Sequence, residues 1–212
     1  VYFEKGKSDR LLRTQLFDLG VPTIETDDHI DPHFMQHVET QKKGDKTIRF
    51  SSIDSQYSNI IESENTNESD IKIKELFSKF LVSVKKEGED ANPMMAEGLA
   101  EIEIVKVSNS KSPAYIKVDE QMKRFQKMTQ SMGNAQMNFP VKKTLVINPA
   151  NPLIQNAFKI HEKGNSEELV SKICHHVEDL AAISSEGLAD ENRELFVERS
   201  QQLIEELTNF AL

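Results

Sequence analysis

The chain ends in two runs whose apolar residues recur at helical spacing, and this pattern limits the possible folds more than any other. The runs are Ser166–Ser184 and Glu191–Phe210, and a short segment containing Gly187 joins them. Apolar positions three or four residues apart share one face of a helix, so the runs predict two amphipathic helices in an antiparallel hairpin. The apolar positions are Leu169, Ile173, Val177, Leu180 and Ile183 in the first run and Leu195, Phe196, Leu203, Ile204, Leu207 and Phe210 in the second.

An amphipathic hairpin has one apolar face that needs a partner. That face can pack onto the preceding part of the same chain. Alternatively, two copies of the hairpin can join in a dimeric four-helix bundle, since two-fold dimers are the commonest soluble assemblies. The spacing of the apolar residues leaves both arrangements open.

The segment before the hairpin predicts a strand, a turn and a helix. Thr144–Ile147 is β-branched and apolar, as expected of a strand. Asn148-Pro149 and Asn151-Pro152 then end the strand, because proline has no N–H for a ladder. Pro152 suits the first turn of a helix that continues to Phe158.

Composition excludes several classes of protein. The net charge of −9 over 212 residues argues against a nucleic-acid partner, and no apolar run reaches the roughly 18 residues of a membrane span. Cys174 is the only cysteine, so no intrachain disulfide is possible and a reducing, cytoplasmic location is expected. Its place beside a helical stripe predicts a packed small side chain rather than a reactive thiol. The chain begins inside a strand-like pattern without Met, which indicates a piece of a longer protein.

The first part of the chain predicts a β-α-β-α-β layout. The strands are expected at Val1–Phe3, Val21–Glu25 and Thr47–Ile53, and the helices at Asp9–Leu19 and Pro32–Val38. Strands that alternate with helices are typical of a small α/β unit with a mostly parallel sheet. The unit has neither a GxGxxG motif nor a Walker loop, so no nucleotide site is predicted there.

A polar segment, Ser63–Ser69, predicts the boundary between a domain of residues 1–66 and a second domain of residues 67–212. The second domain opens with an amphipathic helix at Ile71–Lys86. The whole chain is therefore expected to be α+β. Three strands of the second domain are expected to form a small antiparallel sheet covered by helices: Ala100–Val107, Ala114–Val118 and Leu145–Ile147.

The segment Asp119–Gly133 has a helical pattern whose apolar side is rich in methionine. Its apolar residues follow one another at intervals of three, three and four. Methionine packs acceptably against many apolar shapes, which suits a promiscuous binding surface. An ordinary core-facing stripe explains the same pattern, and both interpretations remain open. The residues are Met122, Phe125, Met128 and Met132.

Two clusters combine histidines with acidic residues. Adjacent histidines point to different faces of a helix, and Asp31 suits a helix N-cap, so a solvated surface explains both clusters better than a metal site. Neither GxSxG nor HExxH occurs, and the chain by itself is not expected to be an enzyme. A metal-dependent enzyme built on the first cluster is the alternative, and a helical interaction module is another. The clusters are His29, Asp31, His33 and His37, and His175, His176, Glu178 and Asp179.

With these residues in place, the chain resembles the C-terminal portion of the ninety-kilodalton heat-shock chaperones, in particular their bacterial members. Thr144–Ile154 resembles the family's strand-turn-helix signature, and the terminal helices follow at the expected spacing. Leu16–Val21 and His29–Phe34 resemble the last α/β subdomain of the family's middle domain. Leu188–Asn192 lacks the proline that usually starts the family's second terminal helix, which leaves the start of that helix open.

The resemblance implies an ATP-dependent stress-response chaperone of which this chain is one part. It implies the end of the middle domain followed by the dimerization and client-binding domain, with ATP and magnesium bound in an N-terminal domain that this chain does not contain. No cofactor, metal ligand or catalytic residue is therefore expected here. The implied partners are a second copy and unfolded client proteins. The implied client-binding residues are Met122, Phe125, Met128, Met132, His33 and Gln36, where His33 replaces the family's aromatic. The implied dimer-interface residues are Ile173, Val177, Leu180, Ile183, Leu195, Phe196, Leu203, Ile204 and Leu207.

Overall fold

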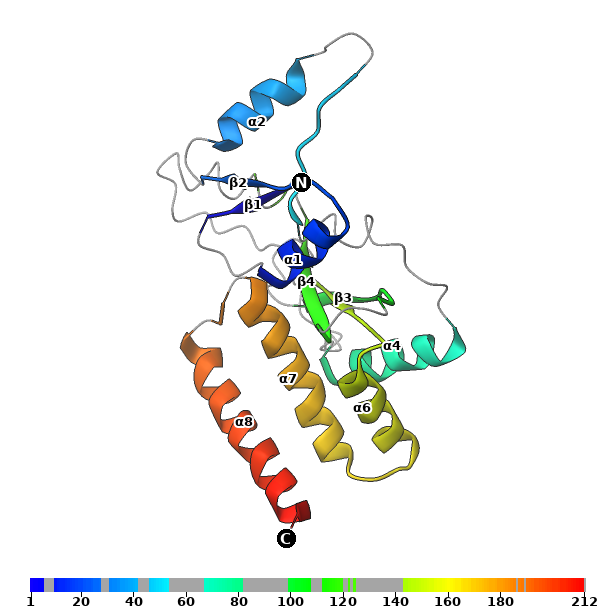
Figure 1. Cartoon of the computed structure of the whole chain (residues 1–212). Coiled ribbons are helices and arrows are strands. Elements are labelled where there is room, and N and C mark those ends of the chain that lie inside the picture. Colours follow the sequence, from blue (N-terminus) through cyan, green and yellow to red (C-terminus); the bar gives the residue numbers. More distant parts are fainter. Residues whose placement is uncertain are drawn as a thin grey trace, which may run out of the picture.

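The computed structural model shows a mixed α+β fold with two small sheets, as the sequence predicts (Figure 1). The structure describes residues 1–5, 10–27, 31–41, 46–53, 67–81, 99–107, 112–119, 122, 124, 143–185, 187–188 and 190–211. Helix α2 lies at one end of the molecule, and the hairpin of α7 and α8 lies at the other. The elements are β1 (Tyr2–Glu4), α1 (Arg10–Asp18), β2 (Ile24–Thr26), α2 (Asp31–Thr40), α4 (Glu68–Leu81), β3 (Leu99–Ile104), β4 (Ala114–Val118), β5 (Lys143–Ile147), α6 (Pro152–Glu162), α7 (Glu167–Ser185) and α8 (Asp190–Ala211).

The first sheet consists of β1 and β2, which pair in parallel as the α/β layout predicts. Between them, α1 buries Leu12 and Leu16, which are four residues apart and share one face. The helix ends at Asp18, and the turn that follows contains Gly20, whose φ of +71° is readily adopted only by glycine. The Gly20 N–H donates to the Phe17 carbonyl at 2.9 Å, which closes the last turn.

The prediction of a third strand in this unit, at Thr47–Ile53, is wrong. Within this segment only Ser52 pairs with the sheet, through a single parallel bridge to Tyr2. The polar backbone of Phe50 is satisfied by side chains instead: its N–H donates to Glu39 at 2.7 Å, and its carbonyl accepts from Arg124 at 2.6 Å. Alternation in the sequence cannot reveal side-chain partners that are so distant along the chain.

The second sheet has the order β3-β5-β4. Strand β5 pairs in parallel with β3 and antiparallel with β4, so the sheet is mixed and the prediction of an antiparallel sheet is wrong. The central position of β5 explains why Leu145, Val146 and Ile147 are all buried, on both faces of the sheet.

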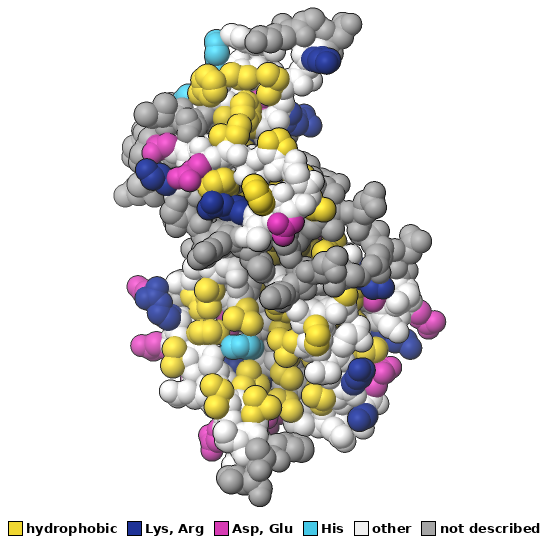
Figure 2. Space-filling view, in the orientation of Figure 1, with side chains coloured by type: hydrophobic (Ala, Val, Ile, Leu, Met, Phe, Trp, Pro, Cys, Tyr) yellow, Lys and Arg dark blue, Asp and Glu magenta, His cyan; other side chains and the backbone are white. Residues whose placement is uncertain are grey.

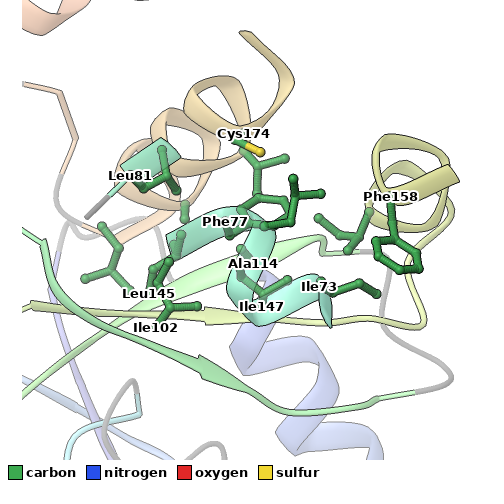
Figure 3. Packing of buried hydrophobic residues seen from close by; sticks show 14 of the residues in the cluster. Ile73, Phe77, Leu81, Ile102, Ala114, Leu145, Ile147, Phe158 and Cys174 are labelled. Carbon is green, nitrogen blue, oxygen red and sulfur yellow. The ribbon is translucent and has the colours of Figure 1, made fainter. Parts of the chain in front are cut away.

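Three helices, α4, α6 and α7, cover one face of this sheet and form the main core with it (Figure 3). Phe77 of α4 is fully buried between the sheet residue Leu145 and Cys174 of α7. Helix α4 starts three residues earlier than predicted, because Asn67 and Asp70 cap it reciprocally with two bonds of 2.9 Å. The predicted end of this helix, residues 82–86, lies outside the described residues.

The opposite face of the sheet packs against the first unit. Phe3, Leu12, Leu16 and Ile53 form one buried cluster with sheet residues from the second predicted domain. The two predicted domains therefore share a continuous core, while most of the predicted boundary at Ser63–Ser69 lies outside the described residues. The residues that the second predicted domain contributes to this cluster are Tyr115 of β4, Val146 of β5 and Val105, which directly follows β3.

The terminal hairpin has the helices that the sequence predicts. Helix α7 packs against β4, α6 and α4, and α8 lies along α7 (Figure 1). Among the residues that the structure describes, no helix is both long enough and apolar enough to cross a membrane.

Candidate dimer and client-binding surfaces

Helix α7 divides its apolar residues between two faces. One face is buried against the sheet, and it is offset by one residue from much of the predicted stripe. Val177 belongs to this buried face with an exposure of 0 %. Val177 was expected at a dimer interface, but its side chain is part of the core of its own chain. The other residues of the buried face are Val170, Cys174 and Ala181.

The predicted stripe on α7 mostly remains at the surface. Leu169, Ile173 and Leu180 are half-buried, and Ile183 is 37 % exposed. Ile173 packs at the edge of the main core, and Leu169, Leu180 and Ile183 keep part of their apolar surface outside the buried face. They leave an apolar strip on the hairpin after the chain has closed its own core.

Helix α8 has no buried side chain among those that the structure describes. Val197, Ile204 and Leu207 recur at seven and three residues, so they share one face, and Leu207 is 71 % exposed. Phe196 and Leu203 are half-buried, whereas Leu195 is exposed. Val197 was missed by the sequence analysis, although its heptad spacing from Ile204 was the signal that would have found it. Figure 2 shows hydrophobic side chains gathered over the half of the molecule where Figure 1 places the hairpin.

Polar contacts fix the alignment of α8 on α7. Lys172 pairs with Glu206 at 2.8 Å and with Glu168 at 3.0 Å, and these hydrogen bonds raise the pKa of Lys172. Arg199 pairs with Asp179 where both side chains are largely buried. Burial raises the pKa of the Asp179 carboxyl, against the opposing effect of Arg199. Two ion pairs therefore join the helices of one hairpin.

His176 also joins the two helices. Its ring stacks on Phe196 with a centroid distance of 5.4 Å and an interplanar angle of 5°. Its Nδ1 atom is buried without a hydrogen-bond partner among the described atoms. Burial and the positive charge of Arg199 lower the pKa of His176, so the ring is neutral near pH 7.

The two clusters of possible metal ligands do not converge on a common point where the structure describes them. His175 lies 3.4 Å from Glu178, while His176 stacks on α8 and Asp179 pairs with Arg199. In the first cluster, His37 hydrogen-bonds with Gln41 at 2.7 Å, and His29 lies outside the described residues. No group of three or more potential metal ligands forms in the described part of the chain.

The predicted client-binding residues of α2 lie on the molecular surface. His33 and Gln36 are exposed, and Met35 between them is buried. Phe34 is 57 % exposed and supplies an aromatic side chain beside His33. The sequence analysis missed Phe34, although helical spacing from the inward-facing Met35 indicates that Phe34 points outward.

The structure describes three positions of the methionine-rich segment, Asp119, Met122 and Arg124. Met122 is half-buried, and its N–H donates to the Asp119 carboxylate at 2.9 Å. Arg124 pairs with Glu39 of α2 at 2.8 Å. The other predicted members of this surface, Phe125, Met128 and Met132, lie outside the described residues.

The Asn-Pro segment that carries the family resemblance has a structural role. The Asn148 side chain accepts from the Val107 N–H at 3.0 Å and donates to the Val107 carbonyl at 2.9 Å, which continues the β3–β5 pairing past the strand end. Asn151 caps α6 by accepting from the Leu153 N–H at 2.9 Å, and Pro152 occupies the first turn as predicted. These asparagines are buried and bonded within the chain, so they are not binding residues.

Cys174 is fully buried, and burial raises the pKa of its thiol to about 12. The prediction of a packed small side chain is confirmed. A thiol in this state is neither a nucleophile nor a metal ligand at neutral pH.

No protein-family model matches the chain, and no curated protein matches its sequence. The functional interpretation therefore rests on the surfaces of the chain itself and on the residues that resemble the chaperone family.

Proposed function

We propose that this chain is the dimerization and client-binding part of a cytoplasmic chaperone similar to the ninety-kilodalton heat-shock chaperones. One observation supports the dimer above all: α8 has no buried side chain among those described, yet it carries a regular apolar stripe. Within the described part of the chain, α7 is the main support of this 22-residue helix, and the exposed apolar residues of α8 form a second face on the surface of that part. A second copy of the hairpin is the natural partner for that face.

The free energy available at this face is compatible with a stable dimer. Full burial of a side chain of the size of Val197, Ile204 or Leu207 stabilises by about 1.5–3 kcal/mol. A two-fold pair buries the three residues from both copies at once. Val197, Ile204 and Leu207 are 48 %, 61 % and 71 % exposed, so burying what remains exposed in both copies contributes about 5–11 kcal/mol. Association costs about 4–15 kcal/mol, so these side chains offset the lower part of that range. The half-buried residues of the same hairpin, such as Leu203, add to the sum.

The dimer is tested by sedimentation at micromolar concentration. The unaltered chain is expected to sediment as a dimer, and Leu207→Glu as a monomer with an unchanged circular dichroism spectrum. Asn209→Glu is the matched control, because Asn209 is exposed on the same helix but lies away from the stripe. A monomeric unaltered chain at this concentration would refute the dimer.

We propose that the exposed face of α2, with His33, Phe34 and Gln36, contacts unfolded client proteins together with the Met122 segment. An exposed phenylalanine flanked by polar groups can bind apolar side chains of an unfolded chain without specifying their sequence. Helix α2 and the hairpin lie at opposite ends of the molecule (Figure 1). A dimer joined through the hairpins therefore leaves the α2 face of each copy accessible.

Suppression of aggregation of an unfolded model protein tests the client surface. Phe34→Ser is expected to weaken suppression severalfold with little change in melting temperature, because Phe34 is 57 % exposed. Phe17→Ser is the matched control, since Phe17 is 80 % exposed but lies on α1. Equal losses in both variants, or none in Phe34→Ser, would contradict the assignment of this face.

A further inference from the structure

Arg124 connects segments that are far apart in the sequence. Its guanidinium pairs with Glu39 of α2 at 2.8 Å and donates to the Phe50 carbonyl at 2.6 Å. It also lies 5.7 Å from the centre of the Tyr2 ring, within the range of a cation–π contact. One side chain from the second predicted domain therefore contacts three segments of the first.

The contact differs from an ordinary surface ion pair. The side chains of Arg124 and Glu39 are only 23 % and 24 % exposed. The second oxygen of the Glu39 carboxylate accepts from the Phe50 N–H at 2.7 Å, so each group is held in more than one direction. Charge-assisted bonds with this degree of burial are stronger than exposed ion pairs, which contribute little.

The position of the contact relates it to the two proposed client-binding regions. Glu39 belongs to α2, three residues after Gln36 and five after Phe34, while Arg124 is two residues after Met122. The pair thus joins the helix that carries one region to the segment that carries the other. Without it, the segment near Met122 would lose the attachment to α2 that the described residues show.

We infer that Arg124 is a positioning residue that holds the Met122 segment against α2, so that both regions contact the same unfolded polypeptide. This inference rests on the proposed client-binding function. Two weak apolar regions held in a fixed relation bind one chain more tightly than either region alone, because the second contact forms without a new loss of translational freedom. The ion pair itself does not contact the polypeptide.

The test combines hydrogen exchange with binding of a permanently unfolded protein, such as reduced and carboxymethylated lactalbumin. In Arg124→Gln, the amides of Phe50 and Met122 are expected to exchange roughly tenfold faster, and affinity for the unfolded protein to fall by about the same factor. The melting temperature should change little. In a Glu39→Gln background, Arg124→Gln should have a smaller effect than in the unaltered chain, because only its contacts with the Phe50 carbonyl and the Tyr2 ring are then lost.

Arg193→Gln is the matched control, because Arg193 forms an exposed ion pair with Asp190 at 3.1 Å and should leave both measurements unchanged. Unchanged exchange in Arg124→Gln would overturn the contact itself. Faster exchange with unchanged affinity would overturn the positioning role while the proposed function stands. If the unaltered chain does not bind the unfolded protein, the proposed function fails and the positioning role with it, whatever the exchange data show about the contact.

Discussion

Replacing Asn148 with alanine tests whether this one side chain holds the end of the central strand. The change removes the two bonds to Val107, at 3.0 and 2.9 Å, and a third from the Ala150 N–H at 3.1 Å. Leaving a buried polar group unsatisfied costs about 1–3 kcal/mol. Val107 and Ala150 are half-buried, so water reaches them in part and the lower value applies to each bond. The expected loss is therefore about 3 kcal/mol.

Urea unfolding followed by circular dichroism measures this loss. The midpoint should fall while the m-value stays constant, because the area exposed on unfolding is nearly unchanged. In a domain of this size, the loss corresponds to a decrease in melting temperature of about 6–12 °C. Asn156→Ala is the matched control, since Asn156 is exposed on α6 and its replacement should change stability by less than about 0.5 kcal/mol. A loss below 1 kcal/mol for Asn148→Ala would refute the reasoning.

Three further predictions concern the core and the hairpin. Phe77→Ala should destabilise the chain by about 3–5 kcal/mol in urea unfolding, because the fully buried ring leaves a cavity; a loss under 1 kcal/mol would contradict the core described. Burial raises the pKa of the Cys174 thiol to about 12, so the thiol should react with a disulfide reagent at pH 8 only as fast as the chain opens. Denaturant should make the thiol react rapidly, whereas rapid labelling of the native chain would be inconsistent with this. Because the folded pKa of His176 is lowered, the unfolded chain binds more protons below its ordinary value of about 6.5, so stability should fall as the pH drops from 7.5 towards 5. His176→Gln should flatten that dependence relative to His175→Gln, and equal slopes in the two variants would show that another group is responsible.

The sequence predicted the terminal hairpin closely, because long periodic runs override local ambiguity. It did not predict correctly which face of α7 is buried against the sheet. The prediction weighted the large side chains Ile173 and Leu180, whereas contact with the sheet selects the face that includes Cys174 and Ala181, whose small side chains let the helix approach closely. Periodicity identifies an apolar stripe, but it cannot decide between two adjacent stripes when only one has room for the neighbouring strand.

Strand positions were also predicted better than strand pairing. Ala114–Val118 was predicted with the bounds observed, since its burial is encoded locally. The antiparallel pairing of this strand with β5 was also predicted, whereas the parallel pairing of β3 with β5 was not, because a strand of a small sheet can pair on either edge in either direction. The backbone hydrogen bonds of Phe50 are made with the side chains of Glu39 and Arg124, which only the folded chain brings together. The candidate surfaces were predicted in part: α2 and the hairpin were located, while Phe34 and Val197 were missed.

The core shared by the two predicted domains has a consequence for the order of folding during synthesis. Phe3 is made 143 residues before Val146, and its cluster is complete only when Val146 has been added. Contacts this distant along the chain form slowly, because a long loop must close before they stabilise anything. On a ribosome that adds about 5–20 residues per second, the first unit therefore has an incomplete apolar core for several seconds. A protein proposed to protect unfolded chains would itself pass through a state in need of such protection.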